Sequence, residues 1–155
     1  MLNFSHADNF VKFVKMSAPE ISEKDKERAF DALKKLPFAR LIGMELVDIR
    51  KGEADVKIAM RDDLRQPYGI LHGGVTATLI DTAMAFAIRT YLEDHEVTTS
   101  VDLTVHYLRP HSEGDAVCTA KVVRPGKRVF TVSADVVNNE GKLIAPGLST
   151  YLKVS

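Results

Sequence analysis

Residues 66–83 read QPYGILHGGVTATLIDTA, a polar loop that passes through two glycines into a strongly apolar segment. Apolar and small residues continue beyond it, and the periodicity predicts one helix over residues 72–92. This helix has almost no polar face, and a helix that is apolar all round must be covered on every side. A curved sheet would cover much of it, and the remaining surface indicates a partner subunit.

The segments on either side of this helix alternate in the manner of strands. Two precede it, joined by a turn at Lys51-Gly52, and four follow it in succession. The predicted strands are 44–49, 54–60, 97–108, 115–124, 128–138 and 142–153. Consecutive strands favour an antiparallel sheet over a βαβ arrangement. We therefore expect an α+β fold in which a long central helix is wrapped by a curved antiparallel sheet.

An N-terminal helical extension, residues 1–37, precedes the main domain, residues 38–155. Its apolar residues recur at helical spacing, a helix start is expected at Ser22, and Pro37 marks an end. The spaced apolar residues include Phe10, Phe13 and Val14. The extension is interpreted as a packing appendage; capping a pocket or enlarging the oligomer are the alternatives.

Composition excludes several classes of function. The 155 residues suit one domain, and 21 basic residues balance 21 acidic ones, so no global field attracts nucleic acid. The single cysteine, Cys118, excludes an intrachain disulfide and fits a reducing compartment. Asp102, His106 and His111 do not make a recognisable ligand set, so no metal site is expected. With no signal peptide or membrane-spanning segment in view, a cytoplasmic protein without membrane contact is expected.

Gly73 and Gly74 stand where the long helix begins. Glycines let a ligand approach the backbone closely. The first N–H groups of a helix lack partners within the helix and lie at the positive end of its dipole. A carbonyl oxygen held there would be polarised, although a plain glycine-containing helix entry has the same sequence.

Asp81 is a lone carboxylate among apolar neighbours in the middle of this helix. Burying an unpaired carboxylate is costly, so its place there needs a reason. One interpretation is a structural residue, bonded to the backbone, to a threonine or to a cation in a salt bridge. The other is a general base or nucleophile with restricted solvation.

The spacing of these features constrains any shared site. Asp81 follows His72 by nine residues, which is roughly 13 Å along a helix axis. Asp81 therefore cannot touch a carbonyl held at the start of its own helix. Antiparallel pairing of two such helices would bring each Asp81 towards the Gly73 of the other copy.

The stretch from Gln66 to Ala83, with its Leu-His-Gly-Gly motif and Asp81, resembles the hotdog-fold acyl-CoA thioesterases, most closely their PaaI-like branch. The resemblance covers about residues 38–155, including Ser100-Val101-Asp102-Leu103 and the final strands. It implies the hotdog fold, hydrolysis of an acyl-CoA without a further cofactor, and a homo-oligomer, dimer or tetramer, whose site spans a dimer interface.

The resemblance also implies a role for each matching residue. Asp81 matches the catalytic carboxylate, which activates water or attacks the thioester. Gly73 matches the residue whose N–H polarises the thioester carbonyl, and Gln66 the amide that contacts substrate or water from the opposite subunit. His72 matches a histidine that supports the site, and Ser100 a hydroxyl that helps to hold the water.

Four basic residues are candidates for the phosphates of coenzyme A. Arg109 ends one predicted strand, and Arg124, Lys127 and Arg128 flank a Pro-Gly turn. In the resemblance these positions lie on the nucleotide-binding surface. A solvated charged hairpin is the alternative interpretation.

The sequence thus predicts hydrolysis of an aryl- or medium-chain acyl-CoA. Met84, Phe86, Ile88 or Tyr68 would line the acyl pocket. The alternative to an enzyme is a binding protein that senses acyl-CoA without cleaving it. A hotdog dehydratase also pairs a histidine with a helical carboxylate, but Gln66 and the glycine pair favour the thioesterase.

Overall fold

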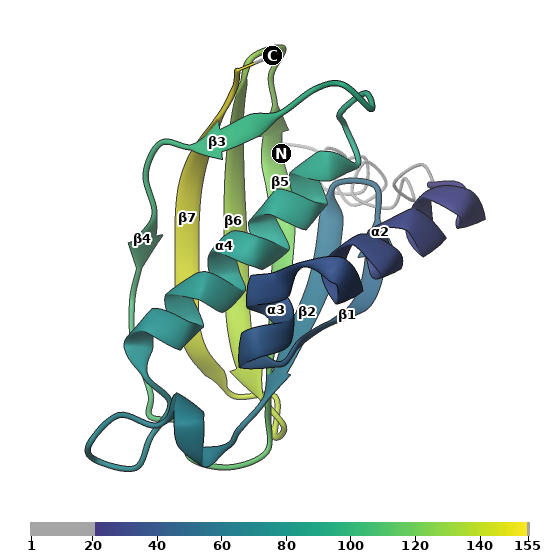
Figure 1. Cartoon of the computed structure of the whole chain (residues 1–155). Coiled ribbons are helices and arrows are strands. Elements are labelled where there is room, and N and C mark those ends of the chain that lie inside the picture. The colour runs from purple at the N-terminus through teal and green to yellow at the C-terminus, as the bar shows by residue number, and fades with distance from the viewer. Residues whose placement is uncertain (1–20, 155) are drawn as a thin grey trace, which may run out of the picture.

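The computed structural model describes residues 21–154, which form two short helices, a hairpin, a long helix and a run of strands (Figure 1). This order confirms the predicted α+β class. The elements are α2 (Glu23–Lys35), α3 (Pro37–Ile42), β1 (Met44–Arg50), β2 (Glu53–Ala59), the 3₁₀ helix η1 (Asp62–Leu64), α4 (Gly73–Arg89), β3 (Thr98–Ser100), β4 (Thr104–Val105), β5 (Asp115–Pro125), β6 (Val129–Asn138) and β7 (Leu143–Lys153).

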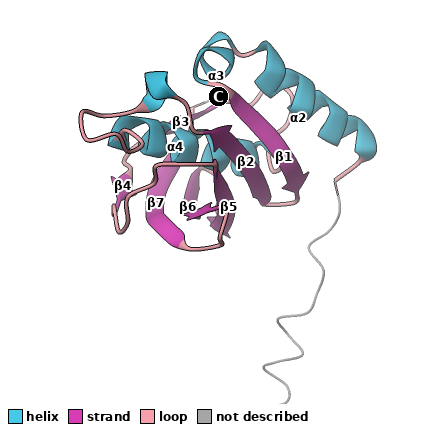
Figure 2. Cartoon of the chain, turned by 90° about the horizontal axis from the view of Figure 1, so that it is seen from below, coloured by secondary structure: helices cyan, strands magenta, loops and turns pink. Residues whose placement is uncertain are grey.

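The strands form one antiparallel sheet in the order β1-β2-β5-β6-β7-β3, and β4 also pairs with β7. Figures 1 and 2 show the sheet curling around α4, which contacts β1, β2, β5, β6 and β7. The predicted wrapping of the long helix is confirmed. Strand β3 ends the sheet, and no strand within residues 21–154 pairs with its outer edge.

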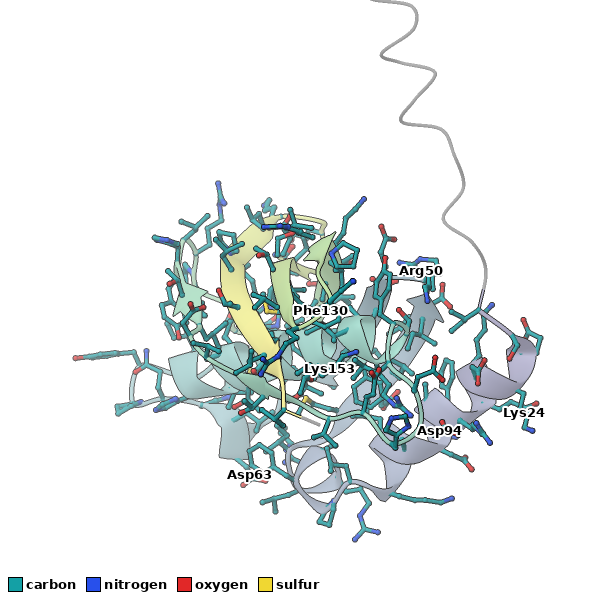
Figure 3. All side chains as sticks on the ribbon, turned by 90° about the horizontal axis from the view of Figure 1, so that it is seen from above. Lys24, Arg50, Asp63, Asp94, Phe130 and Lys153 are labelled. Carbon is teal, nitrogen blue, oxygen red and sulfur yellow. The ribbon has the colours of Figure 1, made fainter. Side chains whose placement is uncertain are left out.

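The core lies between α4 and the concave face of the sheet. Alternate strand residues point inward, so that in β5 Cys118 and Ala120 are buried while Thr119 and Lys121 are exposed. Burying each Leu or Ile contributes about 1.5–3 kcal/mol. In Figure 3 the ring of Phe130 lies within this core, whereas Lys24 projects from α2. The buried residues of α4 are Thr76, Leu79, Ile80, Ala83, Met84, Ala87 and Ile88.

The opposite face of α4 is left uncovered by the sheet. It carries small residues and the helical carboxylate, at the three- and four-residue spacing of one helix face. Its members, all partly or fully exposed, are Gly74, Ala77, Thr78, Asp81 and Ala85. Within residues 21–154 no helix has both the length and the apolarity to cross a membrane.

The N-terminal helices differ from the prediction at Pro37. Helix α2 begins as expected, because the Ser22 hydroxyl accepts a hydrogen bond from the Asp25 N–H at 3.2 Å. It ends at Lys35, and Pro37 opens the separate helix α3 instead of closing the first one. Proline suits a first helical position and forces Leu36 into extended backbone, which separates the helices. Phe10, Phe13 and Val14 lie outside the described residues.

The prediction of a continuous strand over 97–108 was wrong. The structure has β3 and β4 with residues 101–103 between them. The carboxylate Oδ1 of Asp102 accepts a hydrogen bond from the Thr150 N–H at 2.8 Å, and the Asp102 carbonyl accepts one from the Ser149 hydroxyl. Side-chain atoms of Asp102 and Ser149 thus replace backbone hydrogen bonds that a regular strand would make to β7, and the strand breaks there.

Candidate active site

The start of α4 presents one free backbone donor. His72 is the N-cap, and its Nδ1 accepts a hydrogen bond from the Gly74 N–H at 2.9 Å. The ring proton therefore lies on Nε2 when the imidazole is neutral. The Gly73 N–H has no partner among residues 21–154. It is the donor that remains available to a ligand.

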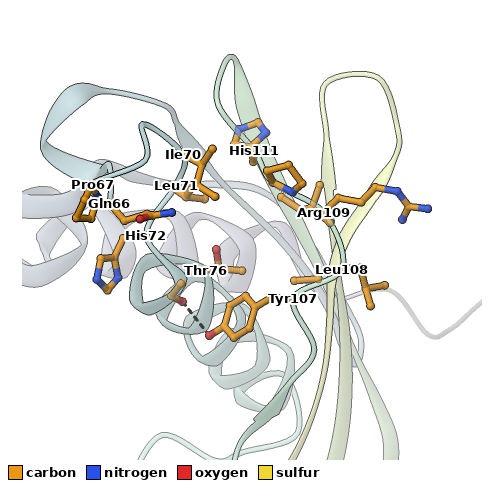
Figure 4. A pocket seen from close by; sticks show the side chains of 14 residues that line it. Gln66, Pro67, Ile70, Leu71, His72, Thr76, Tyr107, Leu108, Arg109 and His111 are labelled. Carbon is orange, nitrogen blue, oxygen red and sulfur yellow. Dashed lines mark hydrogen bonds between the residues drawn. The ribbon is translucent and has the colours of Figure 1, made fainter.

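A cavity of about 540 Å³ opens at this helix end (Figure 4). Its lining includes Gln66, His72, Gly73, Tyr107 and Arg109. The Tyr107 hydroxyl donates to the Gly73 carbonyl at 3.0 Å, and a Cβ added at Gly73 would meet the Tyr107 ring at 3.2 Å. Glycine at this position therefore lets the ring and the helix start lie close together.

The loop before α4 is held by backbone and side-chain bonds. The guanidinium of Arg65 donates to the carbonyls of Gly69 and Ser112, and the Leu71 N–H donates to the His111 carbonyl at 2.7 Å. Gln66 Oε1 accepts a hydrogen bond from the Tyr68 N–H at 3.2 Å. Its amide N–H₂ group has no partner within the described chain and remains available in the cavity.

Asp81 belongs to a second group of residues, deeper along α4. Its Oδ1 accepts hydrogen bonds from the Ser100 hydroxyl at 2.9 Å and from the Tyr151 hydroxyl at 2.6 Å. Asp81 is only partly buried and has two hydroxyl partners, so it is not an unpaired carboxylate in the core. It makes no ion pair with any residue in 21–154. The structural interpretations that name threonine or a cation therefore find no support.

One chain does not bring the two groups together. Asp81 lies eight residues beyond Gly73, roughly 12 Å along the helix, and neither Asp81 nor Ser100 lines the cavity at the helix start. The structure thus contains two half-sites. The first, which we call the donor half, consists of Gln66, His72 and Gly73; the second, the carboxylate half, consists of Asp81, Ser100 and Tyr151.

The four basic candidates do not form one cluster within the chain. Arg109 lies beside the start of β7, where its N–H donates to the Ile144 carbonyl and its guanidinium donates to the Leu143 carbonyl at 2.6 Å, and the residue lines the edge of the cavity. The Arg128 carbonyl accepts from the Lys153 N–H at the other end of β7, roughly 30 Å away. Arg124, Lys127 and Arg128 are exposed around the β5–β6 turn.

Two of the three residues weighed for a metal, Asp102 and His111, have structural contacts instead. His111 is buried with its Nε2 3.4 Å from the Gly114 carbonyl, and Asp102 bonds to Thr150. In the described part of the chain no three His, Cys, Asp or Glu side chains gather as a metal site would require.

Sequence reasoning missed two tyrosines: Tyr107, which bonds to Gly73 of the donor half, and Tyr151 of the carboxylate half. A buried tyrosine hydroxyl normally needs a partner, and Tyr151 is 2% exposed at an inward position of the last strand. That pattern was the available signal. The partner itself was not readable, because Tyr151 and Asp81 are 70 residues apart.

Known proteins resemble this chain over most of its length. A model of the thioesterase superfamily matches residues 68–145. Human acyl-coenzyme A thioesterase 13 is 35% identical over 116 residues, 73% of this chain and 82% of that protein. A 1,4-dihydroxy-2-naphthoyl-CoA hydrolase of Listeria monocytogenes is 27% identical over 103 residues, 66% of this chain and 84% of that protein. The E. coli PaaI structure matches with a TM-score of 0.76 and 22% identity, over 83% of this chain and 92% of that one.

The chain therefore belongs to the thioesterase superfamily, and its fold is the hotdog fold. The matched segment holds the Gly73 helix start, Asp81 and Ser100. The chain is a thioester hydrolase, as its relatives are.

Proposed function

We propose that the chain hydrolyses an aryl- or medium-chain acyl-CoA to the free acid and coenzyme A, at a site built by two copies of the chain. The observation that carries this proposal is the separation of the donor half from the carboxylate half along α4. The names of two relatives supply the substrate class: one is an acyl-coenzyme A thioesterase and the other hydrolyses an aryl-CoA.

Two-fold symmetry makes the two halves complementary. An axis that sets Gly73 of one copy beside the partner's Asp81 must pass near the midpoint of these positions, which is Ala77. Ala77 lies on the uncovered face of α4, among small residues that permit close approach of a second helix. The same axis generates a second, equivalent site on the other side of Ala77.

The open edge of the sheet gives this dimer a surface to bury. The chain from β3 through β4 to residue 108 runs along β7 at the free edge of the sheet, and large apolar side chains there face solvent in the single chain. Val101, Tyr107, Leu108 and Leu148 are 62%, 58%, 51% and 52% exposed. Exposed apolar side chains gathered along a free strand edge are typical of an interface. The proposed dimer acts alone or as half of a tetramer.

The donor half polarises the thioester carbonyl. The unpartnered Gly73 N–H and the positive end of α4 face the position of the carbonyl oxygen, where negative charge develops in the transition state. Losing one such donor typically costs about 2.7–4 kcal/mol of transition-state stabilisation. The Gln66 amide and His72 Nε2–H supply further donors at the same cavity.

The carboxylate half supplies the oxygen chemistry. In one route Oδ2 of Asp81 takes a proton from water as the water oxygen bonds to the carbonyl carbon; the C–S bond then breaks and the CoA thiolate is protonated. In the other route Oδ2 itself bonds to the carbonyl carbon, the thiolate leaves, and water hydrolyses the resulting anhydride. Oxygen-18 from water enters Asp81 only in the second route, when water attacks Cγ of the anhydride and the original Asp81 oxygen leaves with the product acid.

The proposed dimer also brings the basic residues of the two copies close together. Gly52 bonds both to Thr90 just beyond α4 and to Val122 of β5, so the β5–β6 hairpin lies at the C-terminal end of α4. Antiparallel pairing brings the partner's hairpin to the end of this chain that carries Arg109. Arg109 of one copy and the partner's Arg124, Lys127 and Arg128 would meet the phosphates of coenzyme A. The reaction requires no cofactor beyond the coenzyme A of the substrate.

A thiol-release assay over aryl- and aliphatic acyl-CoAs tests this function. The released thiol is distinguishable from the protein's own, because burial raises the pKa of Cys118 and leaves it inert. We expect cleavage of an aryl- or medium-chain substrate by the wild type and by Asp135→Asn, a control at an exposed aspartate. Asp81→Asn should retain the oligomer and lose nearly all turnover. Acyl-CoA binding without thiol release would instead indicate a sensing protein and contradict the proposal, as would full activity of Asp81→Asn.

A further inference from the structure

We infer that Tyr151 is a positioning residue of the thioesterase site: its hydroxyl holds Asp81 by Oδ1, so that only Oδ2 faces the substrate. This inference rests on the proposed function of Asp81. It adds a residue on the last strand to a carboxylate half whose other members, Asp81 and Ser100, lie before residue 101, and it assigns different roles to the two carboxylate oxygens.

The register of the sheet places both donors on the same oxygen. Ser100 of β3 and Tyr151 of β7 are direct cross-strand partners, so their side chains point to the same face of the sheet, towards α4. The Ser100 and Tyr151 hydroxyls lie 2.9 Å and 2.6 Å from Oδ1 of Asp81. Two donors on Oδ1 fix the carboxylate plane, and Oδ2 accepts no hydrogen bond from residues 21–154.

Tyr151 is the more constraining of the two donors. It is 2% exposed, its ring is fixed by core packing, and its hydroxyl also lies 3.0 Å from the Asp81 carbonyl. Burial, followed by the bond to Asp81, raises the pKa of Tyr151, so the hydroxyl stays protonated and remains a donor. Ser100 is exposed, and water competes for its hydroxyl.

No charged side chain competes with these hydroxyls for Asp81. Neither α4 itself nor β3 and β7, which carry the donors, places a Lys, Arg or His within ion-pair distance of Asp81 in the described chain. The direction of Oδ2 is therefore set by neutral donors on two strands. Such a carboxylate has its orientation fixed for the reaction.

Tyr151→Phe removes only the hydroxyl oxygen and tests this role. We expect kcat to fall by roughly ten- to a hundredfold, the effect of losing a hydrogen bond to a charged group, while KM stays unchanged. Tyr91→Phe is the matched control, because Tyr91 packs against Phe130 in the same core and has no bond to Asp81. It should retain wild-type kcat. A Tyr151→Phe enzyme with wild-type kcat would overturn the inference.

A double-mutant cycle separates positioning from a general structural effect. If Tyr151 acts through the carboxylate, Tyr151→Phe has no further effect on the residual rate of Asp81→Asn. An equal loss in both backgrounds would show a structural role and overturn the inference. Wild-type turnover of Asp81→Asn would instead contradict the proposed function itself, so the two failures are distinguishable.

Ser100→Ala supplies a test that does not depend on a change in the core. Since Tyr151 continues to hold Oδ1, we expect this variant to lose kcat several-fold and to stay far above Asp81→Asn. A loss as complete as that of Asp81→Asn would show that Ser100 alone orients the carboxylate, and Tyr151 would then have no positioning role.

Discussion

The Gly73 N–H is one backbone donor on which the proposed chemistry depends, and it can be removed almost alone. His72 has φ −64° and ψ 132°, a conformation that suits the residue before proline, and Gly73 occupies the first helical position, where proline is tolerated. Gly73→Pro should lower kcat by about 10²–10³-fold, the typical effect of losing an oxyanion donor. Steady-state kinetics on the preferred acyl-CoA measure this.

Gly73→Ala is the matched control for that substitution. It adds a Cβ against the Tyr107 ring at 3.2 Å, as proline does, but keeps the N–H. We expect the alanine variant to stay within about tenfold of wild type, since only the ring must shift. Equal activity of the two variants would show that the Gly73 N–H does not act on the substrate.

Residues that lie close together in the sequence were predictable, and those joined by the fold were not. The glycine pair, His72 and Asp81 fall within ten residues, so one motif and the helical rise placed them correctly. Tyr151 joins the site only because β7 pairs with β3 in one register, so the residues around position 151 do not indicate that its partner is Asp81.

At the scale of elements, a network of ion pairs ties β1 to β2. The Arg50 guanidinium, labelled in Figure 3, bonds to Asp48, to Glu53 at 3.3 Å and to Asp55 at 2.9 Å. The other oxygen of Asp55, Oδ1, is buried and has no partner among residues 21–154. Arg50→Met leaves Asp48 and Asp55 without an ion-pair partner, whereas Glu53 keeps Lys121 at 3.1 Å. We expect the free energy of unfolding to fall by about 1–3 kcal/mol at pH 7, measured by urea at fixed protein concentration.

The effect of Arg50→Met should depend on pH in one direction. Burial acts to raise the pKa of Asp48, but the hydrogen bonds from Arg50 and the Ile49 N–H, together with the positive charge of Arg50, outweigh it and hold the pKa below the ordinary value of 3.8. The stabilisation is therefore complete above that value and is lost as the pH falls through the lowered pKa. The gap between wild type and variant should be constant from pH 7 to pH 5 and shrink below 3.8. A constant gap into strong acid would contradict this account.

The predicted strands and hairpins are correct where the residues of a local turn determine them. The hairpins that join β5, β6 and β7 follow from glycine- and asparagine-rich turns between alternating segments. The break between β3 and β4 was missed because it depends on a bond from Thr150 to Asp102, residues 48 positions apart. Pro37 was misread because the same residue type can end one helix and begin another.

At the scale of the whole molecule, Ala77 marks the proposed two-fold axis. Ala77→Arg places a long cation where two α4 helices should meet, so we expect it to dissociate the dimer and abolish turnover while the chain stays folded. Light scattering coupled to size exclusion measures the mass. Ala59→Arg, at an exposed alanine of β2, is the control and should remain a dimer. An Ala77→Arg protein with wild-type mass would contradict the proposed pairing.

The most direct measurement mixes two inactive enzymes, Asp81→Asn and Gly73→Pro, under conditions in which subunits exchange. A mixed dimer joins the intact Gly73 of one copy to the intact Asp81 of the other, which restores one of its two sites. At equal amounts about a quarter of wild-type activity should return, because about half of the dimers are mixed. If exchange is complete and the mixture stays as inactive as its parts, the two halves do not form one site across the interface.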